Sequence, residues 1–457
     1  MRTTHPNIGW AGGALSVFRL PIVWLFVGPP ALRFVTERSA MASMQGSYDF
    51  WNILQVGWWL FWGGVAARDL FLARGWFADV RRRTGSFALW TSLWLFALLL
   101  SCGVSPAPLF SLANVGMLCV LVVAAADLGV KVYGGWVSPR RLLGLLLAVA
   151  VGLLLLIVGI ALIAPTAGGI GVIDPAEMRI RGGSVGYAPL LSLVVVFAGL
   201  YFWLTTKGGA RLFWAFVVVC GVVFLALGQT RSSYGGFLAG IAVFTWLWAR
   251  LGTNPVRLMT GGAILLVVGC GSVLAYHGLG DAAAVYDTLG RLIIREEQTI
   301  SSLTGRTDVI AVLLDAVAQR PLGLGFSAGP RHLLLSDRFV EAMHTDAFGN
   351  AHNAYLEVLA GGGYLAFVAW MVVVGLVLYR GHRVRTRRSV IPFLALLVAV
   401  LLEGVTESLL VLPFEQTSVL FWAIAATVLA LSARTPPTAT AAPGPTTHGP
   451  SINDNRR

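Results

Sequence analysis

The chain has 457 residues, of which 57% are hydrophobic and only 12% are charged. Soluble globular domains carry about 25% charged residues, so the composition excludes that class and indicates a polytopic membrane protein. The net charge of +12 comes mostly from arginine. In a membrane protein this charge reflects loop topology and contact with anionic lipid head groups, and no nucleic-acid-binding motif accompanies it.

Apolar stretches of roughly 20 residues can cross a bilayer as helices, and by this measure we expect about twelve spans. They lie near residues 10–35, 50–67, 85–102, 107–128, 142–164, 188–205, 211–229, 234–250, 256–276, 354–379, 389–411 and 416–432. The residues after 433 are rich in Pro, Thr and Ala, which predicts a disordered tail. The expected fold is therefore an all-α polytopic integral membrane protein.

The basic residues of the short links predict the orientation of the chain. Most of them fall in alternate links, at positions 68–83, 131–141, 207–211, 250–257 and 380–388. Positive links stay in the cytoplasm, so we expect both termini inside and the long polar stretch 277–353 outside. The predicted division is membrane helices over 1–276, an extracytoplasmic loop over 277–353, membrane helices over 354–432 and a cytoplasmic tail over 433–457.

The long loop is expected to be partly helical. Residues 282–297 and 308–320 read as helices, and the second has one apolar stripe and a capping residue, Thr307. The sequence PLGLGFSAGP follows it and reads as a glycine-rich loop before the tenth span.

Three residues of this outer side are candidates for chemistry, because each lies at the expected N-terminus of a helix. They are Arg231, Arg306 and His352, the last followed by Asn353. Free backbone N–H groups at such an end favour an anion, and an arginine beside it can hold a phosphate with two parallel hydrogen bonds. The same helix end favours the neutral form of a histidine, which can accept a proton.

Each residue also has a structural interpretation. Arg231 could be an arginine that extends to the lipid head groups, Arg306 a solvated loop residue, and His352 with Asn353 a helix cap. The three have a common function only if the fold brings them together, which the spacing does not decide. The four cysteines, Cys102, Cys119, Cys220 and Cys270, have no metal-ligand spacing, so we expect no metal and no disulfide framework.

Three motifs resemble the bacterial O-antigen ligase and O-antigen polymerase family of membrane glycan transferases. QTRSSYGG resembles the family's arginine at the outer start of a helix, and GRTDVI followed by RPLGLGFSAGP resembles its Gly-Arg and Pro-x-Gly-x-Gly loop. HNAYLEVLAGGGYLAF resembles its His-Asn signature, with Gly363 at the signature glycine and Ala366 where the family usually has Gly, Thr or Tyr. The strong resemblance covers about residues 211–380.

The resemblance implies a metal-independent and cofactor-free glycosyltransferase in the bacterial cytoplasmic (inner) membrane. Such enzymes move a glycan from a polyprenyl diphosphate carrier to an acceptor hydroxyl of a lipid or glycan on the outer face. Carried over by motif, Arg231 and Arg306 would hold the diphosphate, and His352 would take the proton of the acceptor hydroxyl or orient that hydroxyl. The resemblance does not separate a ligase from an O-antigen or exopolysaccharide polymerase that extends the glycan on its carrier.

Two carboxylates add a further expectation. Glu403 and Glu407 are four residues apart near the outer end of their helix, and carboxylates inside a membrane are costly and often functional. With Asn353 they are candidates for substrate binding along the acceptor path, and a role in helix packing is the alternative. A transporter is the competing class, but the chain shows no pair of matching broken helices in two halves.

Overall fold

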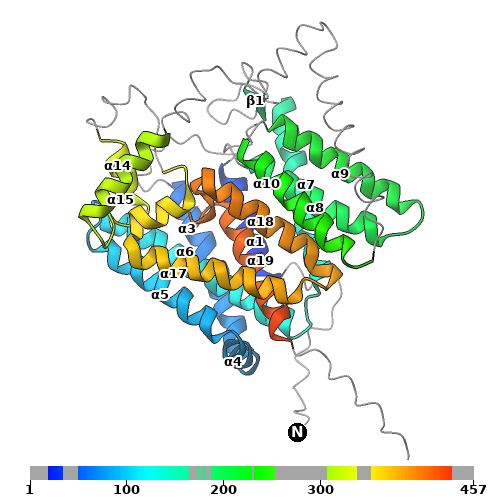
Figure 1. Cartoon of the computed structure of the whole chain (residues 1–457), viewed down its shortest axis with the longest axis horizontal. Coiled ribbons are helices and arrows are strands. Elements are labelled where there is room, and N and C mark those ends of the chain that lie inside the picture. The colour runs from blue at the N-terminus through cyan, green and yellow to red at the C-terminus, as the bar shows by residue number, and fades with distance from the viewer. Residues whose placement is uncertain are drawn as a thin grey trace, which may run out of the picture.

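The computed structural model (Figure 1) describes residues 19–33, 50–163, 173–174, 179–180, 187–228, 231–252, 306–336 and 351–434. The expected span near 256–276, the expected loop helix over 282–297 and the expected tail from 435 onward lie outside these residues. The described residues are helical, except for the antiparallel pair of β1 (Ile173–Asp174) and β2 (Arg179–Ile180) and the connecting turns.

Every expected span within the described residues contains a helix. The first half comprises α1 (Pro21–Arg33), α3 (Phe50–Leu72), α5 (Gly85–Cys102), α6 (Pro108–Tyr133) and α7 (Pro139–Ile163). The second half comprises α8 (Tyr187–Thr205), α9 (Ala210–Leu227), α10 (Arg231–Ala249), α17 (Ala354–Val384), α18 (Ile391–Thr406) and α19 (Gln416–Ala433). Within the described part of the chain, eight helices are long and apolar enough to cross a membrane, so the chain is a multi-pass membrane protein, and the number twelve stays a prediction.

Five short elements complete the described structure. The helix α4 (Arg74–Arg83) stands where the sequence suggested a basic link, and the short turns η3 (Arg388–Val390) and η4 (Ser408–Leu410) flank α18. In the polar insertion, α14 (Arg306–Gln319) confirms the expected second loop helix. The glycine-rich stretch after it is a loop only at first, because α15 (Ala328–Leu334) begins inside it.

The helices differ in how much of their surface other helices cover. Nearly all residues of α8 and α19 are buried, which places these two in the middle of the bundle. By contrast, α9 exposes large apolar side chains such as Leu212, Phe213 and Phe216. A helix that is apolar on every side suits both positions, because lipid accepts the apolar surface that no neighbour covers.

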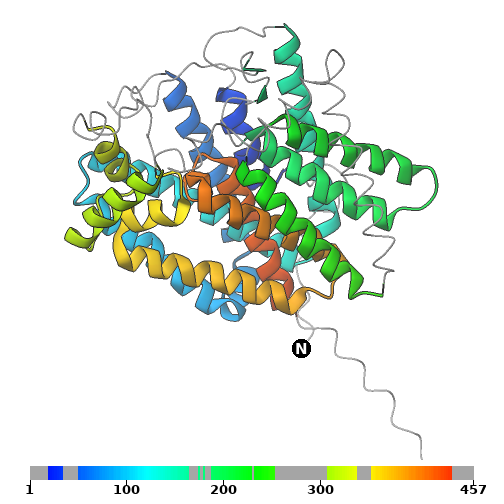
Figure 2. The same ribbon diagram turned by 45° about the horizontal axis from the view of Figure 1, so that its top comes forward.

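Two ends of the bundle carry the polar elements. Figure 1 shows α14, α15 and β1 at one end and α4 at the opposite end, as the alternation of the expected links requires. The second view (Figure 2) shows α17 running the length of the lower side of the bundle, away from α14 and α15 at its start. The start of α17 is therefore beside the polar insertion.

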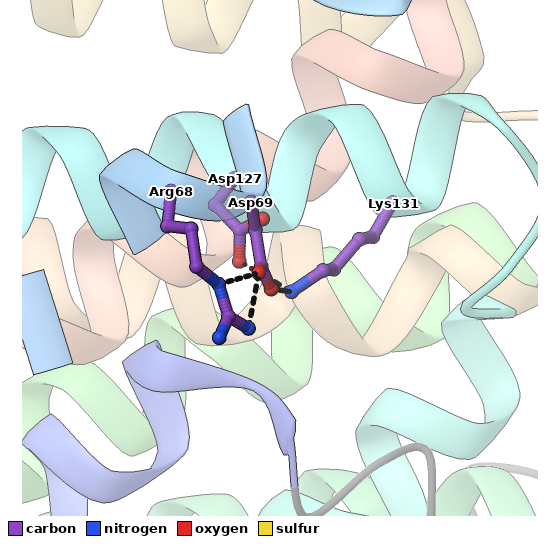
Figure 3. A network of polar contacts seen from close by, with 4 residues as sticks. All are labelled: Arg68, Asp69, Asp127 and Lys131. Atoms are coloured by element: carbon purple, nitrogen blue, oxygen red, sulfur yellow. Dashed lines mark hydrogen bonds and ion pairs between the residues drawn. The ribbon is translucent and has the colours of Figure 1, made fainter. Parts of the chain in front are cut away.

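A buried ion-pair network lies near the α4 end and was not expected from the sequence (Figure 3). Lys131 Nζ donates to Asp69 Oδ2 and to Asp127 Oδ2, both at 2.8 Å, and Arg68 pairs with Asp69. Arg68 and Lys131 were assigned to links, and that assignment is wrong, because α3 and α6 continue past them. The opposite charges compensate one another, which allows the two helices to carry them into the interior.

Candidate active site

His352 lies directly before α17, in a constrained backbone conformation. Its φ angle is 45°, in the left-handed region that residues with a Cβ rarely adopt. Asn353 caps the helix, because its Oδ1 accepts hydrogen bonds from the N–H groups of Tyr355 and Leu356 at 2.9 Å each. The buried Glu357 accepts a hydrogen bond from the N–H of Ala351 at 3.1 Å. Both residues flanking His352 are therefore tied to the first turns of α17.

The end of α18 supplies partners to both motif residues. Glu407 follows α18, and its Oε2 lies 3.5 Å from Nδ1 of His352, a long contact between side chains that are 12% and 27% exposed. The neighbouring Ser408 accepts a hydrogen bond from the N–H of Asn353 at 3.2 Å. A carboxylate on one ring nitrogen orients a histidine and stabilises its positive charge after it takes a proton.

Arg231 is the first residue of α10, so this helix begins slightly earlier than expected, and α10 packs antiparallel against α18. A Cβ built on Gly240 would lie 3.0 Å from the carbonyl oxygen of Ala395, and one on Gly236 would lie 2.8 Å from that of Ala399. The two backbones therefore touch, as small residues allow in membrane helix pairs.

One side-chain hydrogen bond continues this register to the end of the pair at which α10 begins. Ser233 Oγ donates to Glu403 Oε1 at 2.8 Å, and both residues are fully buried. The register places the backbone of Arg231 at the level of the last turn of α18, and Glu407 follows that turn beside His352. The fold thus brings the start of α10 and the start of α17 to the same end of α18.

Arg306 is the first residue of α14, which begins two residues before the expected helix over 308–320, and α14 packs on the first part of α17. The apolar stripe of α14, Val309, Leu313 and Val317, belongs to one buried cluster with Ala351, Leu356 and Ala360. The side chains of Arg231 and Arg306 lie outside the described part of the structure. The two residues are therefore placed by the helix ends at which their backbones lie.

The glycine-rich loop attaches α14 to a break in α17. The N–H groups of Leu324 and Gly325 donate to the carbonyl oxygens of Ala360 and Gly361 at 2.8 and 3.0 Å, and the N–H of Tyr364 donates to Pro321 O at 3.1 Å. The helix is interrupted at Gly363, whose φ of 75° and ψ of −174° are non-helical. The break exposes backbone groups of α17 to the loop, and only glycine adopts this conformation readily.

The other side of the loop contacts the end of α5 and the start of α6. Ser111 Oγ donates to Phe326 O at 2.7 Å, and the N–H of Phe326 donates to Ser101 Oγ at 3.3 Å. The side chain of Phe326 is fully buried. Sequence reasoning missed Ser101 and Ser111, because a lone serine in an apolar helix gives no signal of a partner more than 200 residues away.

The structure thus confirms the helix-end positions of Arg231, Arg306 and His352 and the cap at Asn353. Glu407 lies beside His352, whereas Glu403 is fully buried and bonded to Ser233. The alternative of a simple helix cap is true for Asn353, but it does not account for the His352 and Glu407 contact.

Comparison with protein families gives a match to part of the chain. A search of curated proteins found no related sequence. Residues 216–371 match the model of the family described as O-Antigen ligase, and this range holds α10, α14, the glycine-rich loop and the start of α17. The part of the chain that contains Arg231, Arg306 and His352 is therefore similar to the O-antigen ligase family.

Proposed function

We propose that the chain is a glycosyltransferase of the O-antigen ligase type, which moves a glycan from a polyprenyl diphosphate carrier to a hydroxyl group of a lipid or glycan acceptor. The observation that carries this proposal is the pairing of His352 with Glu407 at the end of the bundle where α10 begins at Arg231. The family match supports a ligase- or polymerase-like reaction with a lipid-linked glycan.

In the proposed reaction, the donor diphosphate lies between the starts of α10 and α14. Free N–H groups and the positive dipole end of each helix attract an anion. Arg231 and Arg306 would add guanidinium groups, which hold phosphate oxygens with paired hydrogen bonds. As the bond between the anomeric carbon and the diphosphate oxygen breaks, that oxygen keeps the electron pair, and the two arginines stabilise its charge.

His352 acts on the acceptor in this scheme. The acceptor hydroxyl oxygen bonds to the anomeric carbon, and its proton passes to the ring nitrogen of His352 that does not face Glu407. Glu407 holds the ring in place and stabilises the protonated form. The backbone turn at Asn353 fixes where the ring points, because its N–H is bonded to Ser408 and its side chain caps α17. Glu407 and Asn353 thereby border the acceptor path.

The proposed orientation puts this end of the bundle outside the cytoplasmic membrane. The basic helix α4 and the links at 207–211 and 380–388 would face the cytoplasm, together with both termini. A diphosphate is already a good leaving group, so the scheme needs no nucleotide and no metal.

The glycan profile of a strain that lacks this protein tests the proposal and separates its two forms. Long glycan chains that stay on the polyprenyl carrier, with none on the acceptor, would indicate a ligase. Single repeat units on the carrier or on the acceptor would indicate a polymerase. A profile unchanged from the parent strain, with the carrier-linked pool also unchanged, would contradict both.

A further inference from the structure

We infer that Ser233 and Glu403 are positioning residues, whose buried hydrogen bond sets the outer start of α10, and Arg231 with it, relative to His352. This assigns Glu403 a different role from the expected contact with the acceptor. The positioning itself follows from the packing of α10 on α18, and its consequence for the donor rests on the proposed function.

The first step is the register of the two helices. Gly240 faces Ala395, Gly236 faces Ala399, and Ser233 bonds to Glu403, so these contacts form one ladder along the antiparallel pair. The contacts at Gly240 and Gly236 involve residues with little or no side chain, and they bring the two backbones close together. The contact between Ser233 and Glu403 is a hydrogen bond with a preferred length and direction. It therefore defines the register of the two helices at the end where Arg231 begins α10.

The hydrogen bond between Ser233 and Glu403 is buried. Ser233 and Glu403 are both fully buried, and their atoms lie 2.8 Å apart. Water does not compete for a bond in such a place, and breaking it leaves a buried carboxyl group with one partner fewer. A shift of the start of α10 away from α18 is therefore costly. A fully enclosed Glu403 also does not touch an acceptor in this arrangement of the helices.

The hydrogen bond between Ser233 and Glu403 lies close in sequence to the partner of His352. Glu403 and Glu407 are one helical turn apart at the end of α18, and Glu407 lies 3.5 Å from His352. The last turn of α18 thus holds the start of α10 through Glu403. Glu407 directly follows this turn, is tied to it by a hydrogen bond from its N–H to Glu403 O at 2.9 Å, and contacts the ring of His352. The distance between the anion site at α10 and the proton acceptor depends on this one turn, and small displacements of reacting groups slow catalysis strongly.

Four variants test the inference. Ser233→Ala and Glu403→Leu remove the bond, whereas Glu403→Gln keeps an oxygen that accepts from Ser233 and removes the charge. Ser192→Ala is the matched control, because Ser192 is also a fully buried serine of a membrane helix, but its hydroxyl donates within α8, to Ala188 O at 2.8 Å. Each protein is purified as the full chain and checked for a single size-exclusion peak.

The first measurement is amide hydrogen exchange over residues 235–238, the first amides of α10 with a helical hydrogen bond. We expect Ser233→Ala and Glu403→Leu to exchange about tenfold faster there, because the loss of one buried hydrogen bond weakens this turn by that order. Glu403→Gln and Ser192→Ala should match the wild type. The double variant Ser233→Ala with Glu403→Leu should be no worse than the worse single variant, since both changes remove the same bond.

The second measurement is glycan transfer from a polyprenyl-diphosphate-linked donor, with kcat and KM separated. We expect Ser233→Ala and Glu403→Leu to raise the KM for the donor, and Glu403→Gln to restore it. Exchange in Ser233→Ala equal to that in Ser192→Ala would overturn the inference. So would a loss of transfer in Glu403→Gln with unchanged exchange, because Glu403 would then act through its charge. A wild-type protein without transfer would contradict the proposed function, while the exchange result would still decide the inference.

Discussion

Gly363 shows at the scale of one residue what a motif glycine does. Its position in the His-Asn signature was recognised by resemblance, and the physical reason is the break in α17 at a φ of 75° and a ψ of −174°. A Cβ there would lie 2.2 Å from the carbonyl oxygen of Pro321. No local pattern in the sequence predicts that a loop from α14 bonds to the backbone at this break.

Replacing Gly363 by alanine should therefore destabilise the protein. We expect a loss of about 3 kcal/mol or more in the free energy of unfolding, from the strained backbone together with the clash. Gly375→Ala is the matched control, because Gly375 lies in the same helix and a Cβ there meets no atom within 4 Å. Thermal unfolding in detergent compares the two, and equal midpoints would contradict this explanation of the motif.

His352 and Glu407 were each identified from the sequence, but the contact between them could not be predicted. The histidine was found because it opens a membrane segment, and the carboxylate was found because it is polar in an apolar helix. Their contact joins residues 55 positions apart, and it depends on how α18 ends beside the start of α17. Sequence spacing contains no information on that approach.

At the scale of elements, the length of the apolar runs predicted the helices well, and their ends less well. The helix α17 continues to Val384, past the basic residues at which the span was expected to stop. The run of arginines before α5 was read as a link and is the helix α4, which buries none of its residues. Charged residues continue a helix as readily as they end it when the helix emerges from the apolar layer.

The contact between α10 and α18 gives a prediction at this scale. Gly236→Ala should lower the free energy of unfolding by about 1–3 kcal/mol, because its Cβ would press on the backbone of Ala399. The adjacent Gly235 is exposed and has open space around it. Gly235→Ala should be neutral or slightly stabilising by about 1 kcal/mol, as alanine favours a helix. If Gly235→Ala were the more damaging of the two, the assigned helix face would be incorrect.

The network that joins α3 and α6 gives a second prediction. Lys131→Met leaves the buried Asp69 and Asp127 without the ammonium group that both contact. Breaking such a network from one side costs about 3–5 kcal/mol, so we expect a clear drop in the thermal midpoint. Lys207 is exposed between α8 and α9, and Lys207→Met should change stability by less than about 0.5 kcal/mol. A similar small effect of both changes would mean that the network does not stabilise the helix pair.

The arrangement of the helices in the bundle could be predicted from the sequence only in part. The basic links predicted that α4 lies at one end of the bundle and the polar insertion at the other, and Figure 1 has them so. Which helices lie in the middle could not be predicted, because α8, α9 and α19 are all apolar on every side. Lipid and protein neighbours satisfy an apolar helix equally well, so only the contacts distinguish α8 and α19 from α9.

The orientation of the molecule in the membrane is a prediction at this scale. In a background without native cysteines, Leu322→Cys and Lys207→Cys place thiols at exposed positions near opposite ends of the bundle. A thiol reagent that does not cross membranes should label Leu322→Cys in intact spheroplasts. It should label Lys207→Cys only after lysis. The reverse pattern would place the proposed active site in the cytoplasm and contradict transfer on the outer face.

The central claim is that His352 accepts the proton of the acceptor hydroxyl during glycan transfer. The most direct measurement is the initial rate of transfer from a polyprenyl-diphosphate-linked glycan by the purified protein in lipid vesicles. His352→Ala should lower this rate about 100-fold or more, and Glu407→Gln should lower it less, because it removes only the group that orients the ring. Asp315→Asn, a change on the exposed side of α14, serves as the control and should leave the rate unchanged. A folded His352→Ala protein with the wild-type rate would contradict the account.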